Sequence, residues 1–198
     1  MTEIVGTVSA VILAAGESRR MGTPKALLPF REGTFLSHLA GTLAQRCSPV
    51  IAVFGHDAAR LMPACPATAI PVENRDYRLG MLTSLQTGLR SLPSQTEAVF
   101  FTPIDHPAVD GATIEALLQS QALIAIPRYN GTRGHPVLLR KSVIEEFLSE
   151  PVSSKVHDVI NRHAAEIEYI DTTDPGVTDD IDDRALYRGL LEREAVSR

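Results

Sequence analysis

The feature that most constrains this fold is a regular alternation of short apolar runs with amphipathic segments. Several runs are apolar almost without interruption, as strands are when both faces of a sheet are covered. The predicted strands lie at 8–13, 50–54, 69–72, 98–102, 123–127, 135–140 and 166–170. Apolar residues at helical spacing predict helices at 34–46, 81–92, 111–121, 141–149, 155–164 and 183–195. This order predicts an α/β fold: a three-layer, Rossmann-like, doubly wound and mostly parallel sheet.

Length and composition narrow the class of protein. The chain has 198 residues, which predicts one domain over residues 1–198. The net charge of −5 argues against a nucleic-acid partner, because duplex binders normally carry a basic face. Cys47 and Cys65 lack the spacing of a zinc or redox motif, which fits a reducing compartment.

The sequence carries no membrane signal. No apolar run approaches the roughly 20 residues that a helix needs to span a bilayer. Residues 1–20 do not have the form of a signal peptide, because their start is not basic and arginines follow the apolar part. We therefore expect a cytoplasmic protein without a membrane partner.

The loop after the first predicted strand combines glycine with positive charge. Ligands in this fold bind at the carboxyl ends of strands, where this loop begins. Gly16 lets backbone N–H groups approach an anion, and Arg19, Arg20 and Lys25 add charge. Such a loop suits the binding of a triphosphate. The alternative interpretation is an ordinary turn between a strand and a helix, with basic residues that are exposed to solvent. The Walker and dinucleotide-binding glycine spacings are both absent.

Residues 13–25 read Leu-Ala-Ala-Gly-x-Ser-x-Arg-Met-Gly-x-Pro-Lys. This pattern resembles the signature loop of the MobA-like nucleotidyltransferases, whose fold is of the nucleotide-diphospho-sugar transferase type. The resemblance implies that the loop wraps the β- and γ-phosphates of a nucleoside triphosphate. It also implies catalytic roles for Arg20 and Lys25, with Lys25 stabilising charge at the α-phosphorus. The nucleotide-binding residues that it implies in this loop are Leu13, Ala14, Ala15, Gly16, Ser18 and Gly22.

A second segment with a family pattern lies at 74–89. It contains Asn-x-x-x-x-x-Gly-Met-x-x-Ser-Leu, which resembles the molybdenum cofactor cytidylyltransferases within the family. The resemblance implies nucleotide contacts from Asn74, Gly80 and Ser84. Helix capping and core packing remain the alternative for these residues.

Two acidic segments are candidates for a metal site. Asp105 follows the strand at 98–102, and Asp105-His106-Pro107 resembles the Asp-x-Pro of the family. Asp180-Ile181-Asp182 resembles its Asp-Ile-Asp, although the Thr-Pro-Glu that usually follows is replaced. The resemblance implies a catalytic role for Asp105 and Mg²⁺ ligands at Asp105 and Asp182, with Asp180 as second choice, since carboxylates are hard oxygen ligands. A turn residue and a solvated helix start are the ordinary alternatives.

The segment 131–137 reads Gly-x-Arg-Gly-His-Pro-Val. It resembles the acceptor side of the molybdopterin-type transferases, which implies acceptor binding by Arg133, Gly134 and His135. A hairpin-like turn is the alternative interpretation.

The resemblance as a whole implies a defined reaction. An enzyme of this kind transfers CMP from CTP to the phosphate of molybdopterin or molybdenum cofactor, with Mg²⁺, and releases pyrophosphate. Ala15 favours CTP over GTP, because guanylyl-transferring relatives tend to have glycine there. A client molybdoenzyme or its chaperone is a further expected partner. Three alternatives stay open: GTP as donor, a sugar or polyol phosphate as acceptor, and a nucleotide-binding module without catalysis.

Overall fold

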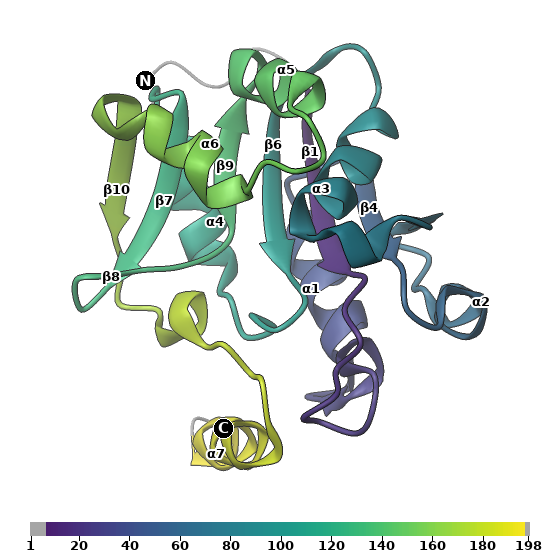
Figure 1. Cartoon of the computed structure of the whole chain (residues 1–198). Helices are drawn as coiled ribbons and strands as arrows, with labels where there is room; N and C mark the ends of the chain where they lie inside the picture. The colour runs from purple at the N-terminus through teal and green to yellow at the C-terminus, as the bar shows by residue number, and fades with distance from the viewer. Residues whose placement is uncertain (1–6, 197–198) are drawn as a thin grey trace.

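The computed structural model describes residues 7–196, which form a twisted sheet with helices on both faces (Figure 1). The strand order is β10-β7-β9-β6-β1-β4-β5, and β8 pairs with β7 outside this path. The strands are β1 Thr7–Ala14, β4 Val50–Phe54, β5 Ile70–Glu73, β6 Thr96–Pro103, β7 Ile124–Tyr129, β8 Thr132–Arg133, β9 Val137–Arg140 and β10 Ile167–Asp171. The prediction of a mostly parallel, three-layer α/β fold is confirmed.

The centre of the sheet is built from its most apolar strands. β1 lies between β6 and β4 and is parallel to both, so the three strands end at the same edge. β9 runs antiparallel to both β6 and β7, which makes the sheet mixed at that point. The separate β2 (Pro29–Phe30) and β3 (Gly33–Thr34) form a two-residue ladder that the sequence pattern does not reveal.

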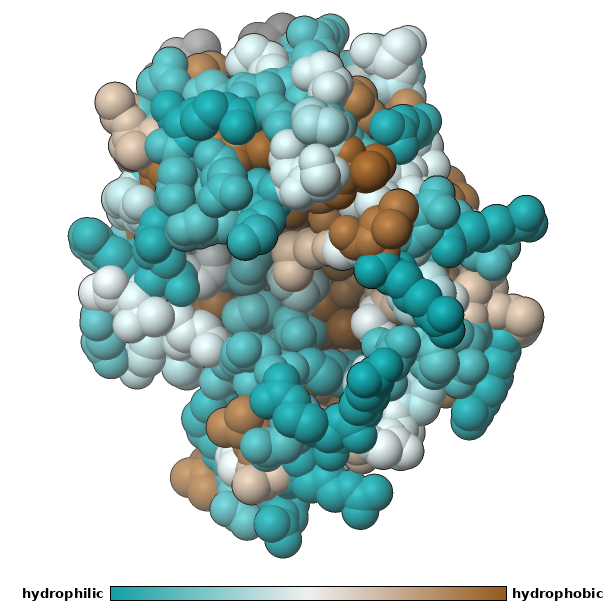
Figure 2. All heavy atoms as spheres, in the orientation of Figure 1, coloured by the Kyte–Doolittle hydropathy of each residue, from teal (hydrophilic) through white to brown (hydrophobic). Residues whose placement is uncertain are grey.

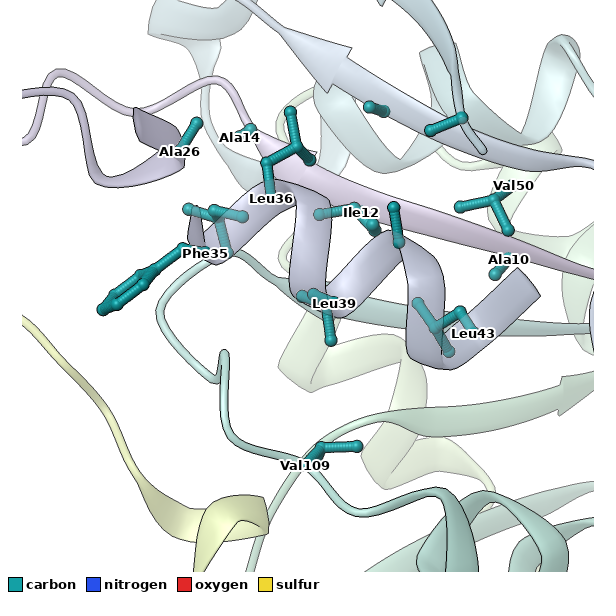
Figure 3. Close-up of a cluster of buried hydrophobic side chains, with 14 of the residues drawn as sticks. Ala10, Ile12, Ala14, Ala26, Phe35, Leu36, Leu39, Leu43, Val50 and Val109 are labelled. Carbon is teal, nitrogen blue, oxygen red and sulfur yellow. The ribbon is translucent and has the colours of Figure 1, made fainter. Parts of the chain in front are cut away.

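Helices α3 (Met81–Arg90), α5 (Lys141–Ser149) and α6 (Val156–Arg162) cover one face of the sheet, and α1 (Phe35–Ala44) and α4 (Gly111–Leu118) cover the other (Figure 1). Strand side chains alternate between these two layers, because successive residues point to opposite faces. Ile12 packs with Leu36, Leu39 and Leu43 of α1, as Figure 3 shows, whereas Val11 packs with the α3 layer.

The remaining helices lie at the rim. α2 (Ala58–Leu61) is a short turn after β4, and α7 (Arg184–Val196) lies beyond the carboxyl ends of the central strands (Figure 1). Tyr187 fixes α7 to the body, since its hydroxyl donates to Pro29 O at 2.6 Å and its ring meets Phe35 edge-on. Within residues 7–196, none of the helices has the length and apolarity to cross a membrane.

Candidate active site

A cavity of about 880 Å³ opens where β1 and β6 end. Its walls come from the loop after β1, the loop after β6, the start of α3 and the segment before α7. The space-filling view shows a hollow on this face, beside the carboxyl ends of the central strands (Figure 2). This is the position at which parallel α/β sheets bind ligands.

The loop after β1 is ordered by Ser18. The carbonyl of Ser18 accepts hydrogen bonds from the N–H groups of Met21 and Gly22, each at 3.1 Å. Its hydroxyl accepts a bond from the Lys25 N–H at 3.2 Å. Ser18 itself has a φ of 48°, so the chain turns sharply there. These bonds hold the loop in one shape, and that shape places Lys25 beside the cavity.

Gly16 lines the cavity without any packing reason to be glycine. A Cβ built at this position would meet no protein atom within 4 Å. Gly16 is part of the cavity wall, so a side chain here would take up open space beside the backbone. A glycine here therefore favours close approach of a ligand to the backbone. Leu13, Ala14, Ala15 and Ser18 also line the cavity, whereas Gly22 does not.

Lys25 joins the two acidic segments that are far apart in the sequence. Its Nζ lies 3.1 Å from Asp105 Oδ2 and 2.5 Å from Asp182 Oδ1, and its side chain is only 9% exposed. Burial alone would lower the pKa of Lys25, but the hydrogen bond and charge of Asp182 and Asp105 outweigh it and the pKa is raised. Lys25 is therefore a stably charged group at the wall of the cavity.

Arg20 adds a second positive charge at the same place. Its guanidinium is bonded to Asp182 Oδ2, and its side chain is 68% exposed. The hydrogen bond from Lys25 is the main cause that lowers the pKa of Asp182, and Arg20 contributes. Arg20, Lys25, Asp105 and Asp182 all line the cavity, so the structure brings these predicted residues together.

The three predicted metal ligands form one cluster. Asp105, Asp180 and Asp182 each offer a carboxylate oxygen, and these oxygens lie within 4.8 Å of one another. Burial raises the pKa of Asp180, and the negative charges of Asp105 and Asp182 raise it further. Within residues 7–196, the buried Asp105 Oδ1 has no hydrogen-bond partner. This set of hard oxygen donors fits a divalent cation such as Mg²⁺ or Mn²⁺.

The start of α3 forms another wall of the cavity. Gly80 has a φ of 121°, a conformation that side chains disfavour, and it lines the cavity beside Met81 and Ser84. Asn74 is only 3% exposed and lies behind this wall. Its amide donates to Thr83 Oγ1 at 3.0 Å and to Ser84 Oγ at 2.9 Å. Asn74 thus holds Ser84 in place rather than facing the cavity.

Tyr77 and Arg78 also line the cavity, and the sequence analysis does not single them out. The Arg78 guanidinium lies 5.6 Å from the centre of the Tyr77 ring. A Cβ at Gly55 would come within 2.5 Å of Tyr77 Cβ, so Tyr77 occupies space that this glycine leaves open. The sequence signal for Tyr77 is Gly55, directly after β4. The reason for this glycine can be recognised only from Tyr77, which lies more than 20 positions further along the chain.

The predicted acceptor residues lie outside this cavity. Arg133 is exposed on β8 and donates to the Tyr169 hydroxyl at 3.5 Å. Gly134 packs against Val177, and the His135 N–H donates to Val177 O at 2.8 Å. Four residues further on, the Ile181 N–H donates to Asp105 O at 3.0 Å. Residues 134–135 therefore hold the segment 177–181 in place through backbone contacts, and that segment in turn contacts Asp105 of the acidic cluster.

The His135 ring lies against Phe101 and His106. Its centre is 5.7 Å from that of Phe101 and 4.7 Å from that of His106. Burial lowers the pKa of His135 to about 3, and the neighbouring His106 contributes. His135 is therefore a neutral imidazole at ordinary pH.

Solved structures share this fold. A nucleotidyl transferase from Methanothermobacter matches with a TM-score of 0.83 and 18% identity, covering 97% of this chain and 99% of that one. A manganese complex of Rv0371c from Mycobacterium tuberculosis H37Rv matches with a TM-score of 0.73 and 23% identity, covering 94% and 98%. At these identities the likeness shows the fold alone. The chain therefore has the fold of a solved nucleotidyl transferase.

The sequence match is more specific than the fold. The model of the MobA-like NTP transferase domain matches residues 10–167, so the chain belongs to the MobA-like nucleotidyltransferase family. A molybdenum cofactor cytidylyltransferase from Escherichia coli K12 is 30% identical, over 88% of this chain and 96% of that protein. A probable molybdenum cofactor guanylyltransferase from Mycobacterium bovis BCG is 35% identical, over 61% of each chain.

Proposed function

We propose that this enzyme acts in molybdenum cofactor biosynthesis and transfers CMP from CTP to the phosphate of molybdopterin, with release of pyrophosphate. The observation that carries the proposal is the meeting of Lys25, Asp105 and Asp182 at the wall of a cavity that the signature loop also lines. The similarity to a cytidylyltransferase over 88% of the chain supports the choice of substrates.

The chemistry needs positioning and charge rather than a general base. The attacking phosphate of the pterin is already ionised near neutral pH, and the leaving group is pyrophosphate. Charge that develops on the α-phosphoryl oxygens is stabilised by fixed cations nearby. Lys25 and Arg20 supply these cations, and the ordered backbone around Ser18 and Gly16 binds the β- and γ-phosphates.

A divalent metal ion completes the proposed site. Asp105 and Asp182 would hold it, with Asp180 as a third carboxylate, because their oxygens already lie within 4.8 Å of one another. When bound, Mg²⁺ or Mn²⁺ neutralises phosphate charge and orients phosphate oxygens. The burial of the Asp105 side chain, at 21% exposed, favours a fixed ligand.

The nucleobase is assigned to the wall between the signature loop and α3. Ala15, Gly80 and Ser84 line this part of the cavity. Ala15 lines the cavity and carries a methyl group where guanylyl-transferring relatives tend to have glycine. We infer that this methyl group keeps a base further from the backbone, which favours cytosine over guanine, so CTP is the proposed donor. GTP is the second candidate, because a probable guanylyltransferase matches 61% of the chain.

The acceptor is assigned to the side of the acidic cluster nearest β8. Arg133 is the exposed cation of this segment, and we propose that it binds the anionic acceptor while Gly134 and His135 fix the segment from behind. Product transfer to a client molybdoenzyme or its chaperone would follow. A sugar or polyol phosphate acceptor, and a binding module without catalysis, are the competing functions.

Pyrophosphate release tests the proposal. The purified protein is incubated with molybdopterin and Mg²⁺, and CTP, GTP, ATP and UTP are compared in parallel. Release with CTP alone is the expected result. Release mainly with GTP would keep the reaction and overturn the base assignment. CTP binding without release, for pterin and for sugar and polyol phosphates alike, would leave only a binding module.

A further inference from the structure

Lys25 and the metal ion of the proposed function require the same two carboxylates. The ammonium group of Lys25 is bonded to Asp105 Oδ2 and Asp182 Oδ1. These two residues, with Asp180, form the carboxylate cluster that fits a divalent cation. Asp105 Oδ1 has no hydrogen-bond partner within residues 7–196, but both oxygens of Asp182 are engaged, Oδ1 by Lys25 and Oδ2 by Arg20. A cation that binds Asp182 at roughly 2.0–2.6 Å therefore competes with Lys25 or Arg20 for this carboxylate.

Lys25 is not free to leave these carboxylates without a replacement. Its side chain is 9% exposed, and its backbone N–H is fixed to Ser18 Oγ. A buried ammonium group that loses its partners carries a large desolvation cost. The same holds for the carboxylates, which repel one another when no cation lies between them. Lys25 therefore leaves the carboxylates favourably only when a metal cation takes its place there and an anion becomes the new partner of its ammonium group.

The cavity provides the place for that anion. Lys25 lines it together with Gly16, Ser18 and Arg20, which form the predicted triphosphate site. We propose that Lys25 is an internal counterion that competes with the metal ion for Asp105 and Asp182, and that the phosphates of the nucleotide draw Lys25 away and so admit the metal. This inference rests on the proposed function. Metal binding and nucleotide binding should therefore strengthen each other. The metal ion takes the carboxylates from Lys25, which leaves Lys25 available to the phosphates. The phosphates take Lys25 from the carboxylates, which leaves the carboxylates available to the metal ion.

Manganese binding without nucleotide or acceptor tests the competition directly. The full chain is titrated with Mn²⁺ alone, and free Mn²⁺ is followed by electron paramagnetic resonance. Lys25→Met and Lys25→Gln should each bind Mn²⁺ at least about tenfold more tightly than the wild type, because the competing ammonium group is gone. Lys25→Met combined with Asp182→Asn should lose this gain, which assigns it to the cluster.

Arg19→Met is the matched control. Arg19 lines the same cavity, but its partner is Glu17 and not a carboxylate of the acidic cluster. Arg19→Met therefore removes the same charge from the same region as Lys25→Met does, without removing a competitor for the metal ion. It should change the Mn²⁺ affinity by less than about threefold, because long-range charge effects are screened by salt. An equal gain for Arg19→Met and Lys25→Met would overturn the proposal, since general electrostatics would then explain both.

Unchanged or weaker Mn²⁺ binding by both Lys25 variants would also overturn the proposal. Thermal unfolding in EDTA and in Mn²⁺ checks that the variants fold. The expected result is a lower melting temperature for Lys25→Met in EDTA and a larger rise with Mn²⁺ than in the wild type, and an equal rise would count against competition. The Mn²⁺ titration contains neither nucleotide nor pterin, so its outcome does not depend on whether the proposed reaction occurs. Likewise, a failed competition test would leave the proposed reaction untouched.

Discussion

At the scale of single residues, the site depends on one buried ammonium group and the carboxylates around it. Lys25→Ala and Asp105→Ala should each lower turnover by at least about 10²-fold, because each removes charge that stabilises the transition state. Steady-state pyrophosphate release measures this effect, and circular dichroism checks that both variants fold. Near-normal turnover in both variants would contradict the assigned roles.

Arg46→Ala is the control for these variants. Arg46 is 53% exposed, lies outside the cavity wall and is paired with Glu115. Its removal should change turnover by less than about threefold, as is usual for an exposed ion pair.

His135 should make the fold sensitive to acid. Its pKa is about 3 in the folded protein and near 6.5 in the unfolded chain, so the unfolded state takes up a proton first as the pH falls. Stability from the neutral, buried ring is complete above pH 6.5 and is lost as the pH falls towards 3. Between pH 7 and 5, the wild type should lose about 2 kcal/mol more unfolding free energy than His135→Gln.

Urea unfolding of both proteins at the two pH values measures this difference. Equal losses in the wild type and His135→Gln would show that the ring titrates normally and is not held neutral by burial.

The sequence predicts which residues form the candidate site better than it predicts which residues surround them. The sequence patterns predict Lys25, Asp105 and Asp182 as site residues, and the structure places both carboxylates in contact with Lys25. Asn74 is predicted beside the nucleotide, and in the structure its amide donates to Thr83 and Ser84. No sequence pattern predicts Tyr77, because its position depends on the space beside Gly55. Such contacts between distant residues leave no periodic pattern in one sequence.

At the scale of elements, the junction between β8 and β9 is a structural support as well as a candidate acceptor segment. A Cβ at Gly134 would lie 2.1 Å from Val177 O, and backbone cannot move aside cheaply. Gly134→Ala should therefore lower the free energy of unfolding by about 2 kcal/mol or more. Urea denaturation measures the change.

Gly189→Ala is the matched control for this substitution. Gly189 lies within α7, and a Cβ there would meet no atom within 4 Å. This variant should gain about 0.5–1 kcal/mol, because alanine favours helix more than glycine does. A Gly134→Ala protein with normal stability would mean that the close contact with Val177 is not rigid.

The start of α7 positions the signature loop. Arg184 Nε donates to Met21 O at 3.2 Å, in the turn that Ser18 organises. Arg184→Ala should raise the KM for the nucleotide about three- to tenfold and leave kcat nearly unchanged, since one hydrogen bond orders the loop before binding. Arg184→Lys should restore part of the affinity. Arg188→Ala, on an exposed position of α7, serves as control.

A fall in kcat with an unchanged KM for Arg184→Ala would contradict this account, because it would place Arg184 at the reacting groups. The usual family residues at 183–185 are replaced in this chain, and the contact from Arg184 shows how the replacement still connects α7 to the loop.

At the scale of the whole molecule, the order of strands and helices was predictable and the topology only in part. Long apolar runs such as β1, β4 and β6 are buried on both sides, so their composition identifies them. The antiparallel direction of β9 depends on how the chain turns after β8, which composition does not encode. The short β2–β3 ladder is likewise held by contacts with α1 and α7 rather than by its own pattern.

The chain's central property is that two acidic segments, more than 70 residues apart, meet one lysine from the signature loop. This meeting requires the parallel arrangement of β1 and β6, because both loops must leave the same edge of the sheet. The proposed catalytic centre is thus a consequence of the fold as a whole. No single segment contains it.

Mass spectrometry of the product tests this account most directly. The enzyme is incubated with molybdopterin, Mg²⁺ and equal concentrations of CTP and GTP, and the pterin is recovered. The account predicts a pterin whose mass has increased by one cytidylyl group, that is CMP less one water, formed by the wild type and strongly reduced with Lys25→Ala at the same reaction time. A pterin that stays unmodified in the presence of folded wild-type enzyme, or a CMP adduct formed equally well by Lys25→Ala, would contradict it.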